Sequence, residues 1–147
     1  MKSVMLFMAL TLVFLCISVH RVRASEQQDS EPNCMINAGP CIKTVDGLTV
    51  AFEVTPKPLK AMRSLLFRTT ISNQGSPVAD ASVSIDLSMP GMFMGQNVIG
   101  LTRLRDGIYE GKGVIIRCPS GKKIWRASVA IQRAGKESVA NYIFEVQ

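Results

Sequence analysis

Alternation of apolar and polar residues dominates the chain from residue 41 onward. The clearest example is the segment 82–88, where Val83, Ile85 and Leu87 fall on one face and the serines and an aspartate fall on the other. A period of two residues is typical of a β-strand with one buried face. No stretch repeats apolar residues at helical spacing over three turns. The pattern therefore predicts an all-β domain over residues 41–147.

Turn residues divide this domain into short strands. Asp46-Gly47 is a strong hairpin signal, and similar glycine turns recur at Asp106-Gly107 and Ala134-Gly135. The strands we predict are 41–45, 48–54, 65–72, 82–88, 97–104, 108–117, 124–132 and 139–146. Seven to eight strands with regular turns predict an immunoglobulin-like antiparallel β-sandwich.

The first 24 residues have the features of a secretory signal peptide. Lys2 precedes an apolar run over residues 4–19, and Val22-Arg23-Ala24 resembles a cleavage site. The run is shorter than the roughly 20 residues that span a bilayer, so we expect no transmembrane helix in the mature chain and a periplasmic or secreted, soluble product. A lipid anchor on Cys16 is the alternative. Residues 25–40 are polar and are predicted to be a flexible N-terminal segment.

Charge and histidine content limit the function. The chain has 17 Lys and Arg against 11 Asp and Glu, but three of the cations lie in the first 24 residues, which leaves 14 against 11. No basic block is interleaved with aromatic residues, so nucleic-acid binding has no support. The single histidine, His20, also lies in the signal peptide. Without histidine or a nucleophile motif, we expect no enzymatic activity.

Three cysteines follow the signal peptide, namely Cys34, Cys41 and Cys118. An exported protein meets an oxidising compartment, so one disulfide and one remaining thiol are expected. If successive strands run up and down, Cys41 and Cys118 lie at the same end of the sandwich, which favours a Cys41–Cys118 disulfide. The competing pairing is Cys34–Cys41, which leaves Cys118 free.

Methionine is concentrated between residues 89 and 95, which read Met-Pro-Gly-Met-Phe-Met-Gly. Thioethers are soft ligands that select Cu(I) over harder ions, so Met89, Met92 and Met94 are predicted to bind Cu(I). The strand count places the candidate neighbours of this site at the same end of the sandwich. These neighbours are Met62, Cys118 and Trp125.

The methionines also have an interpretation without metal. Met89 packs into the core in this interpretation, and Met92-Phe93-Met94 form an exposed apolar knob. Contiguous exposed apolar residues mark interaction sites, so the knob predicts a docking surface. Trp125 then serves as a core anchor.

The order of several motifs resembles the YtkA-like domain of exported bacterial proteins and the periplasmic part of FixH-type proteins. The motifs are Met-Pro-x-Met at 89–92, Gly-x-Tyr at 107–109, Gly121 and Trp125, and the resemblance covers roughly residues 48–146. It implies an immunoglobulin-like sandwich outside the cytoplasmic membrane, associated with copper handling or oxidase assembly and without enzymatic activity. Met89 and Met92 fall on the family's paired methionines, whereas Cys118 replaces a methionine or another apolar residue.

Together these features lead to two functional hypotheses. The first is an exported Cu(I)-binding or copper-handling accessory protein that passes the ion to an envelope protein of copper efflux or oxidase assembly. The alternative is a metal-free envelope adaptor or protein–protein interaction module.

Overall fold

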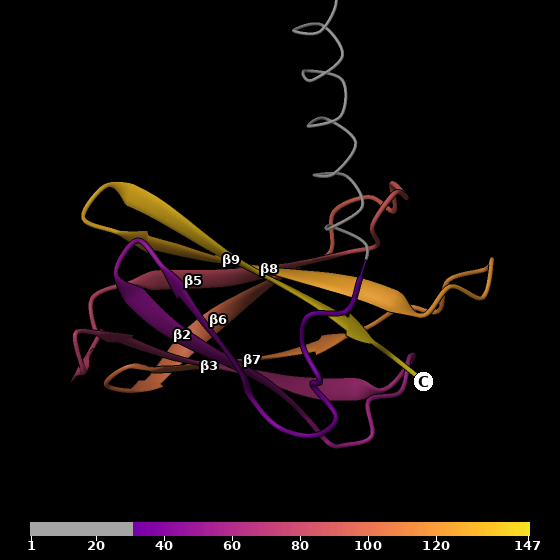
Figure 1. Ribbon diagram of the computed structural model, residues 1–147, viewed down its shortest axis with the longest axis horizontal. Helices are drawn as coiled ribbons and strands as arrows, with labels where there is room; N and C mark the ends of the chain where they lie inside the picture. The colour runs from indigo at the N-terminus through magenta and orange to yellow at the C-terminus, as the bar shows by residue number, and fades with distance from the viewer. Residues whose placement is uncertain (1–30) are drawn as a thin grey trace, which may run out of the picture. The chain divides into compact units, whose positions relative to one another are not determined.

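A computed structural model describes residues 31–147, and these residues form nine β-strands and no helix (Figure 1). The strands are β1 (Cys41–Val45), β2 (Leu48–Thr55), β3 (Ser64–Asn73), β4 (Ser76–Pro77), β5 (Ser82–Ser88), β6 (Val98–Arg105), β7 (Ile108–Val114), β8 (Ile124–Arg133) and β9 (Lys136–Glu145). The all-β prediction is confirmed. Since the described region is free of helices, nothing in it has the form of a membrane-spanning helix. The predicted signal peptide, 1–24, lies outside the described residues.

Two antiparallel sheets pack face to face and share one strand. The first sheet has the order β1, β2, β3, β7, and the second has the order β5, β8, β9 (Figure 1). Strand β6 belongs to both, because Val98–Leu101 pair with β5 and Thr102–Arg105 pair with β7. The short β4 pairs only with β3. This arrangement confirms the predicted antiparallel sandwich and shows that one of its sides is closed by a strand that changes sheets.

Two glycines of β7 allow β6 to cross so closely. A Cβ atom on Gly111 would lie 2.7 Å from the carbonyl oxygen of Gly100 in β6. A Cβ atom on Gly113 would lie 2.3 Å from Cδ1 of Ile99, also in β6. Both distances are shorter than any ordinary van der Waals contact. A side chain at position 111 would push the β6 backbone away, and one at position 113 would displace the Ile99 side chain.

Aromatic side chains fill the core between the two sheets. Phe52 of β2 lies 5.0 Å from Tyr142 and 6.1 Å from Phe144 of β9, measured between ring centroids. The Tyr142 hydroxyl donates a 2.7 Å hydrogen bond to the Val50 carbonyl, which ties β9 to β2 across the interior. In β5 the alternation correctly predicted the buried face, because Val83, Ile85 and Leu87 are all buried.

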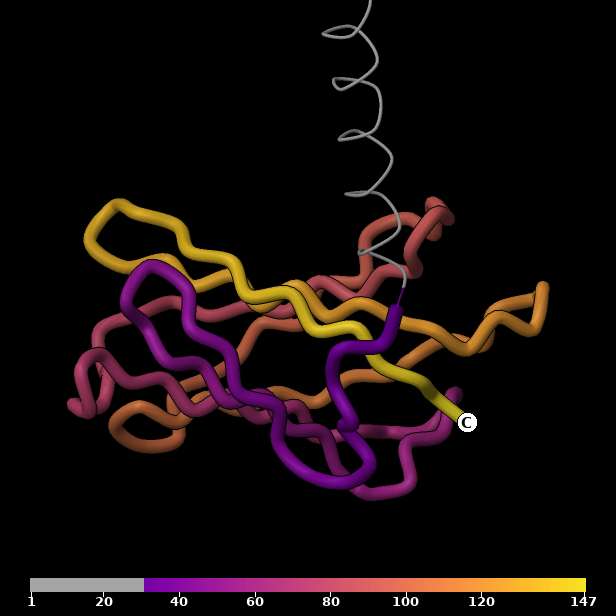
Figure 2. Tube along the Cα trace, in the orientation of Figure 1, coloured from indigo at the N-terminus to yellow at the C-terminus, as the bar shows by residue number. Residues whose placement is uncertain are grey.

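The N-terminal part of the domain is ordered against the second sheet. The backbone N–H groups of Asn33 and Cys34 donate to the carbonyl of Ile143 in β9, at 2.9 and 3.0 Å, and Ile36 is buried. Figure 2 shows this indigo segment running beside the yellow C-terminal strand. A flexible segment was predicted for 25–40, of which the structure describes 31–40. These residues are docked rather than free, because hydrogen bonds to a distant strand hold them.

The predicted Cys41–Cys118 disulfide is wrong. Cys34 bonds to Cys41, with Cα atoms 5.6 Å apart, and Cys118 is a free, buried cysteine. Cys118 follows β7, which is three strands away from β1 in the first sheet. At about 4.8 Å per strand this separation is about 14 Å, whereas a disulfide requires Cα atoms within roughly 7 Å. Counting strand ends identified the correct end of the sandwich but not the position across it.

Candidate functional site

The methionine segment begins with a tight turn at the end of β5. The backbone N–H of Met92 donates a 3.1 Å hydrogen bond to the carbonyl of Met89, and Gly91 has a φ angle of 70°. Proline at the second position and a left-handed glycine at the third are the signature of a type II turn. The Pro90-Gly91 turn that folds the segment back on itself is therefore present. It places Met89 and Met92 opposite each other as an isolated β-bridge.

The side chains of this segment differ in burial. Met89 is 3% exposed and belongs to the core, while Met92 and Met94 are partly buried and pack against it. Only Phe93 is fully in solvent, at 96% exposure. The predicted three-residue apolar knob is therefore a single phenylalanine, with a partly buried thioether on either side.

A second turn brings the free thiol to the methionines. Cys118 begins the turn that leads from β7 to β8, and its carbonyl accepts a 3.0 Å hydrogen bond from the N–H of Gly121. The Sγ atom of Cys118, a residue only 4% exposed, lies 3.8 Å from Sδ of Met92. Two sulfur atoms that are 26 residues apart in the sequence are thus neighbours at one end of the sandwich.

Ser120 and Lys122 make this thiol more acidic. The Ser120 hydroxyl lies 3.0 Å from Sγ of Cys118, and this hydrogen bond is the main cause of a lowered pKa for Cys118. Backbone hydrogen bonds of Ser120 and Lys122 and the charge of Lys122 lower the pKa further, against the opposing effect of burial. A lowered thiol pKa increases the fraction of thiolate, which is the form that binds metals.

The distance between the sulfurs suits shared coordination of one ion. With metal–sulfur bonds of about 2.3 Å, two ligands of a tetrahedral or trigonal site are about 3.8 to 4.0 Å apart, whereas two ligands of a linear site are about 4.6 Å apart. The observed 3.8 Å matches the first two geometries. Among residues 31–147, no group of three or more His, Cys, Asp or Glu side chains could hold a metal, so a site here depends on thioethers.

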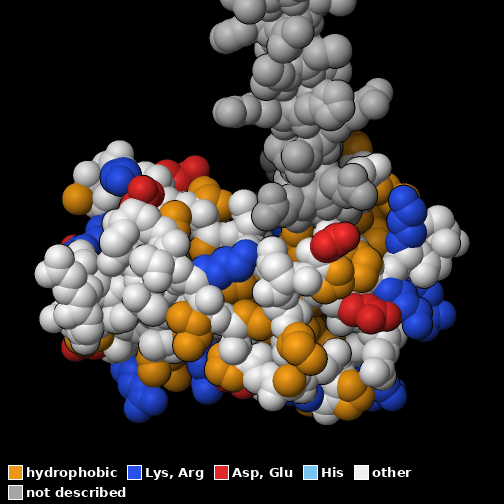
Figure 3. Space-filling model, viewed as in Figure 1, with side chains coloured by type: hydrophobic (Ala, Val, Ile, Leu, Met, Phe, Trp, Pro, Cys, Tyr) orange, Lys and Arg blue, Asp and Glu red, His pale blue; other side chains and the backbone are white. Residues whose placement is uncertain are grey.

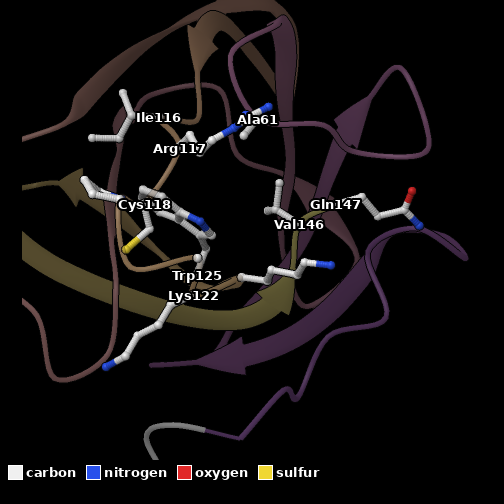
Figure 4. A pocket seen from close by; sticks show the side chains of 11 residues that line it. Ala61, Ile116, Arg117, Cys118, Lys122, Trp125, Val146 and Gln147 are labelled. Carbon is white, nitrogen blue, oxygen red and sulfur yellow. The ribbon is translucent and has the colours of Figure 1, made fainter.

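The other predicted neighbours lie at the same end of the molecule. Trp125 is 2% exposed and lines a pocket together with Cys118 (Figure 4). Met62 is 62% exposed, and its backbone N–H donates to the carbonyl of Ile115, shortly before Cys118. Strand counting therefore placed Met62, Trp125 and Cys118 at the correct end. Trp125 is a core anchor, as the alternative interpretation expected.

Sequence reasoning missed the role of Ser120. The residue was part of the Pro-Ser-Gly turn signal, but the turn alone did not indicate that its hydroxyl bonds to the cysteine two positions earlier. The contact between Cys118 and Met92 was also obscured, because the expected disulfide had removed Cys118 from the ligand set. The Cys-Pro-Ser spacing at 118–120 was a signal for the hydroxyl contact, whereas no local pattern indicates the contact with Met92.

Comparison with known proteins identifies the family of this chain. The YtkA-like family model matches residues 42–117, which is 76 residues and more than half of the chain. The match contains the whole methionine segment and ends one residue before Cys118, so Gly121 and Trp125 lie outside it. No curated protein and no solved structure is similar enough to this chain to match it.

Proposed function

This chain belongs to the YtkA-like family, and we propose that it is a non-enzymatic, exported accessory protein that binds Cu(I) through sulfur ligands and passes it to an envelope protein of copper efflux or oxidase assembly. The family suggests an exported accessory domain, and the case for Cu(I) binding is argued from the residues of this chain. One observation carries it, namely the 3.8 Å separation of Cys118 Sγ and Met92 Sδ.

The chemistry of this pair favours a soft monovalent ion. A thiolate and a thioether are ligands that select Cu(I), whereas magnesium and calcium prefer oxygen. Met89 and Met94 are the thioethers nearest to Met92 in the sequence, and both belong to or pack against the core. Cys118 and Met92 are the principal ligands in this proposal, and Met89 or Met94 completes the coordination shell.

Release of the ion to a partner is favoured by where these ligands lie. Met92 is partly buried, so it shields the ion, yet it adjoins Phe93, which is in solvent. An exposed aromatic residue beside the ligands offers a partner an apolar first contact, after which its own sulfur or imidazole groups replace the ligands one at a time.

Competition for Cu(I) tests this function. The protein is titrated anaerobically against bicinchoninate with ascorbate, which keeps copper monovalent and leaves the Cys34–Cys41 disulfide intact. We expect one Cu(I) per chain, and a loss of affinity of at least about tenfold in Met92→Leu and in Cys118→Ser, since even loss of an outer-shell partner costs roughly 10- to 100-fold. Met35→Leu, at an exposed methionine, is the matched control. Unchanged affinity in both ligand variants would eliminate the proposal.

The exposure of Phe93 supports the metal-free adaptor as a second candidate function. Substitution by Asp removes the only fully exposed apolar side chain of this loop while leaving Met92 and Cys118 in place. An adaptor loses its partner in Phe93→Asp whether or not copper is present, whereas a copper carrier retains Cu(I) affinity and loses only the rate of transfer.

A further inference from the structure

A pocket of about 360 Å³ opens beside the sulfur pair, and Cys118 forms part of its wall. It lies between the loop that joins β7 to β8, Ala61, and residues 146 and 147 at the end of the chain (Figure 4). Clefts that bind small molecules have volumes of roughly 300 to 1,000 Å³, so this pocket suits a compact ligand.

The inner surface of the pocket is apolar. Trp125 and Val146 are buried side chains that line it, and Ala61 and Ile116 add further aliphatic surface. Figure 4 shows Cys118 and Trp125 toward one end of the pocket and Gln147 toward the other. An indole provides a large flat contact area for a ring or a branched alkyl group.

The rim of the pocket is positively charged. Arg117, Lys122 and Lys123 line it, all three are exposed, and no lining side chain is acidic. None of the three forms an ion pair with a carboxylate anywhere in residues 31–147. Figure 3 shows lysine and arginine side chains at the end of the molecule where Figure 1 places this loop. Cations around a low-dielectric cleft concentrate anions in it.

A second charged pocket, at the opposite ends of the strands, has no such excess of unpaired cations. Its cations are already neutralised, because Arg133 lies 2.7 Å from Asp80 and Lys136 lies 3.4 Å from Asp46. Unpaired positive charge thus distinguishes the pocket beside Trp125 from this second pocket.

We infer that the pocket beside Trp125 binds a small organic anion in which a carboxylate is joined to an apolar, ring-shaped or branched body. The body lies against Trp125 and Val146, and the carboxylate faces Lys122, Lys123 and Arg117 at the rim. Lysine stems are flexible, so the ammonium groups adjust to the position of the carboxylate. Although Cys118 lines the pocket, the carboxylate is held by cations and not by sulfur, so this activity differs from copper binding.

Fluorescence of Trp125 tests the inference directly, because it is the only tryptophan in the chain. Copper-free protein is titrated at low salt with phenylacetate and, separately, with neutral phenylacetamide. We expect a saturable fluorescence change with phenylacetate. The affinity should fall about tenfold for phenylacetamide and for the Lys122→Gln/Lys123→Gln variant, because each removes most of the attraction between the carboxylate and the exposed cations.

Two control variants separate this result from other effects. Lys112→Gln removes an exposed lysine that does not line the pocket, and Met92→Leu removes a sulfur of the copper site; both should bind phenylacetate as the unaltered protein does. Absence of saturable binding, or equal binding of phenylacetate and phenylacetamide, would overturn the inference. Neither outcome bears on Cu(I) affinity, so the copper proposal stands or falls by its own test.

Discussion

At the scale of single residues, the decisive feature is the environment of Cys118. A buried cysteine in apolar surroundings has a raised pKa and is inert, but Ser120 and Lys122 reverse that tendency here. The same thiol contacts Met92. The thiolate, a stronger ligand than a thioether, is therefore in contact with the methionine turn. The environment of Cys118, more than the number of methionines, makes this end of the domain suitable for a soft metal.

We predict that Ser120→Ala raises the pKa of Cys118, because it removes the hydrogen bond that contributes most to the lowered value. The measurement is a pH titration of thiolate ultraviolet absorbance, with Cys118→Ser as the blank and Ser76→Ala, at an exposed serine, as the control. Since protons compete with metal for the thiolate, Cu(I) affinity should weaken as the pH falls below the pKa of Cys118, and this decline should begin at higher pH in Ser120→Ala. An identical titration for both serine variants would contradict the assignment.

At the scale of strands, the sequence predicted most of what the structure contains. The eight predicted strands correspond to β1 to β3 and β5 to β9, because half-buried strands have a period of two and their turns carry Asp-Gly or Ala-Gly. Strand ends were less accurate. β7 stops at Val114 rather than Arg117, because its neighbour β3 begins at Ser64, the partner of Val114, and provides no further residue. Alternation within a strand does not reveal where its neighbour ends.

The glycines of β7 make the crossing of β6 testable. We predict that Gly111→Ala destabilises the domain by about 1 to 3 kcal/mol, the usual cost of overpacking, because the new Cβ meets the backbone oxygen of Gly100 at 2.7 Å. Gly100→Ala is the matched control, since it also lies in a strand and its Cβ has nothing within 4 Å. Urea unfolding measures both. Equal midpoints for the two variants would show that β6 does not depend on this close approach.

At the scale of the whole molecule, the features that sequence reasoning missed are contacts between distant residues. The Asn33 side chain accepts from the N–H of Ile143, 110 positions away, and the next residue, Cys34, also donates to the Ile143 carbonyl. No local pattern encodes such a contact, because the polar composition of residues 25–40 is equally compatible with a free segment. The wrong disulfide and the missed thiol ligand have this same cause, since placing Cys34 correctly leaves Cys118 free.

At the scale of the whole domain, two proposed sites with different chemistry lie side by side at one end. The soft pair Cys118 and Met92 lies under the methionine turn, and the cationic pocket lies beside Trp125, with the 118–123 loop contributing to both. The ion pairs of Asp46 and Asp80 neutralise the charges of the pocket at the opposite strand ends. Both proposed sites thus lie where β5 and β7 end and β8 begins.

Copper K-edge X-ray absorption of the Cu(I)-loaded protein tests the central claim most directly. Because the only histidine of the chain is His20, a site in residues 31–147 must rely on sulfur. We predict a first shell of sulfur atoms alone at about 2.3 Å, with one sulfur fewer in Cys118→Ser. A shell of nitrogen or oxygen, or a spectrum unchanged when Cys118 and Met92 are both replaced, would contradict the proposed site.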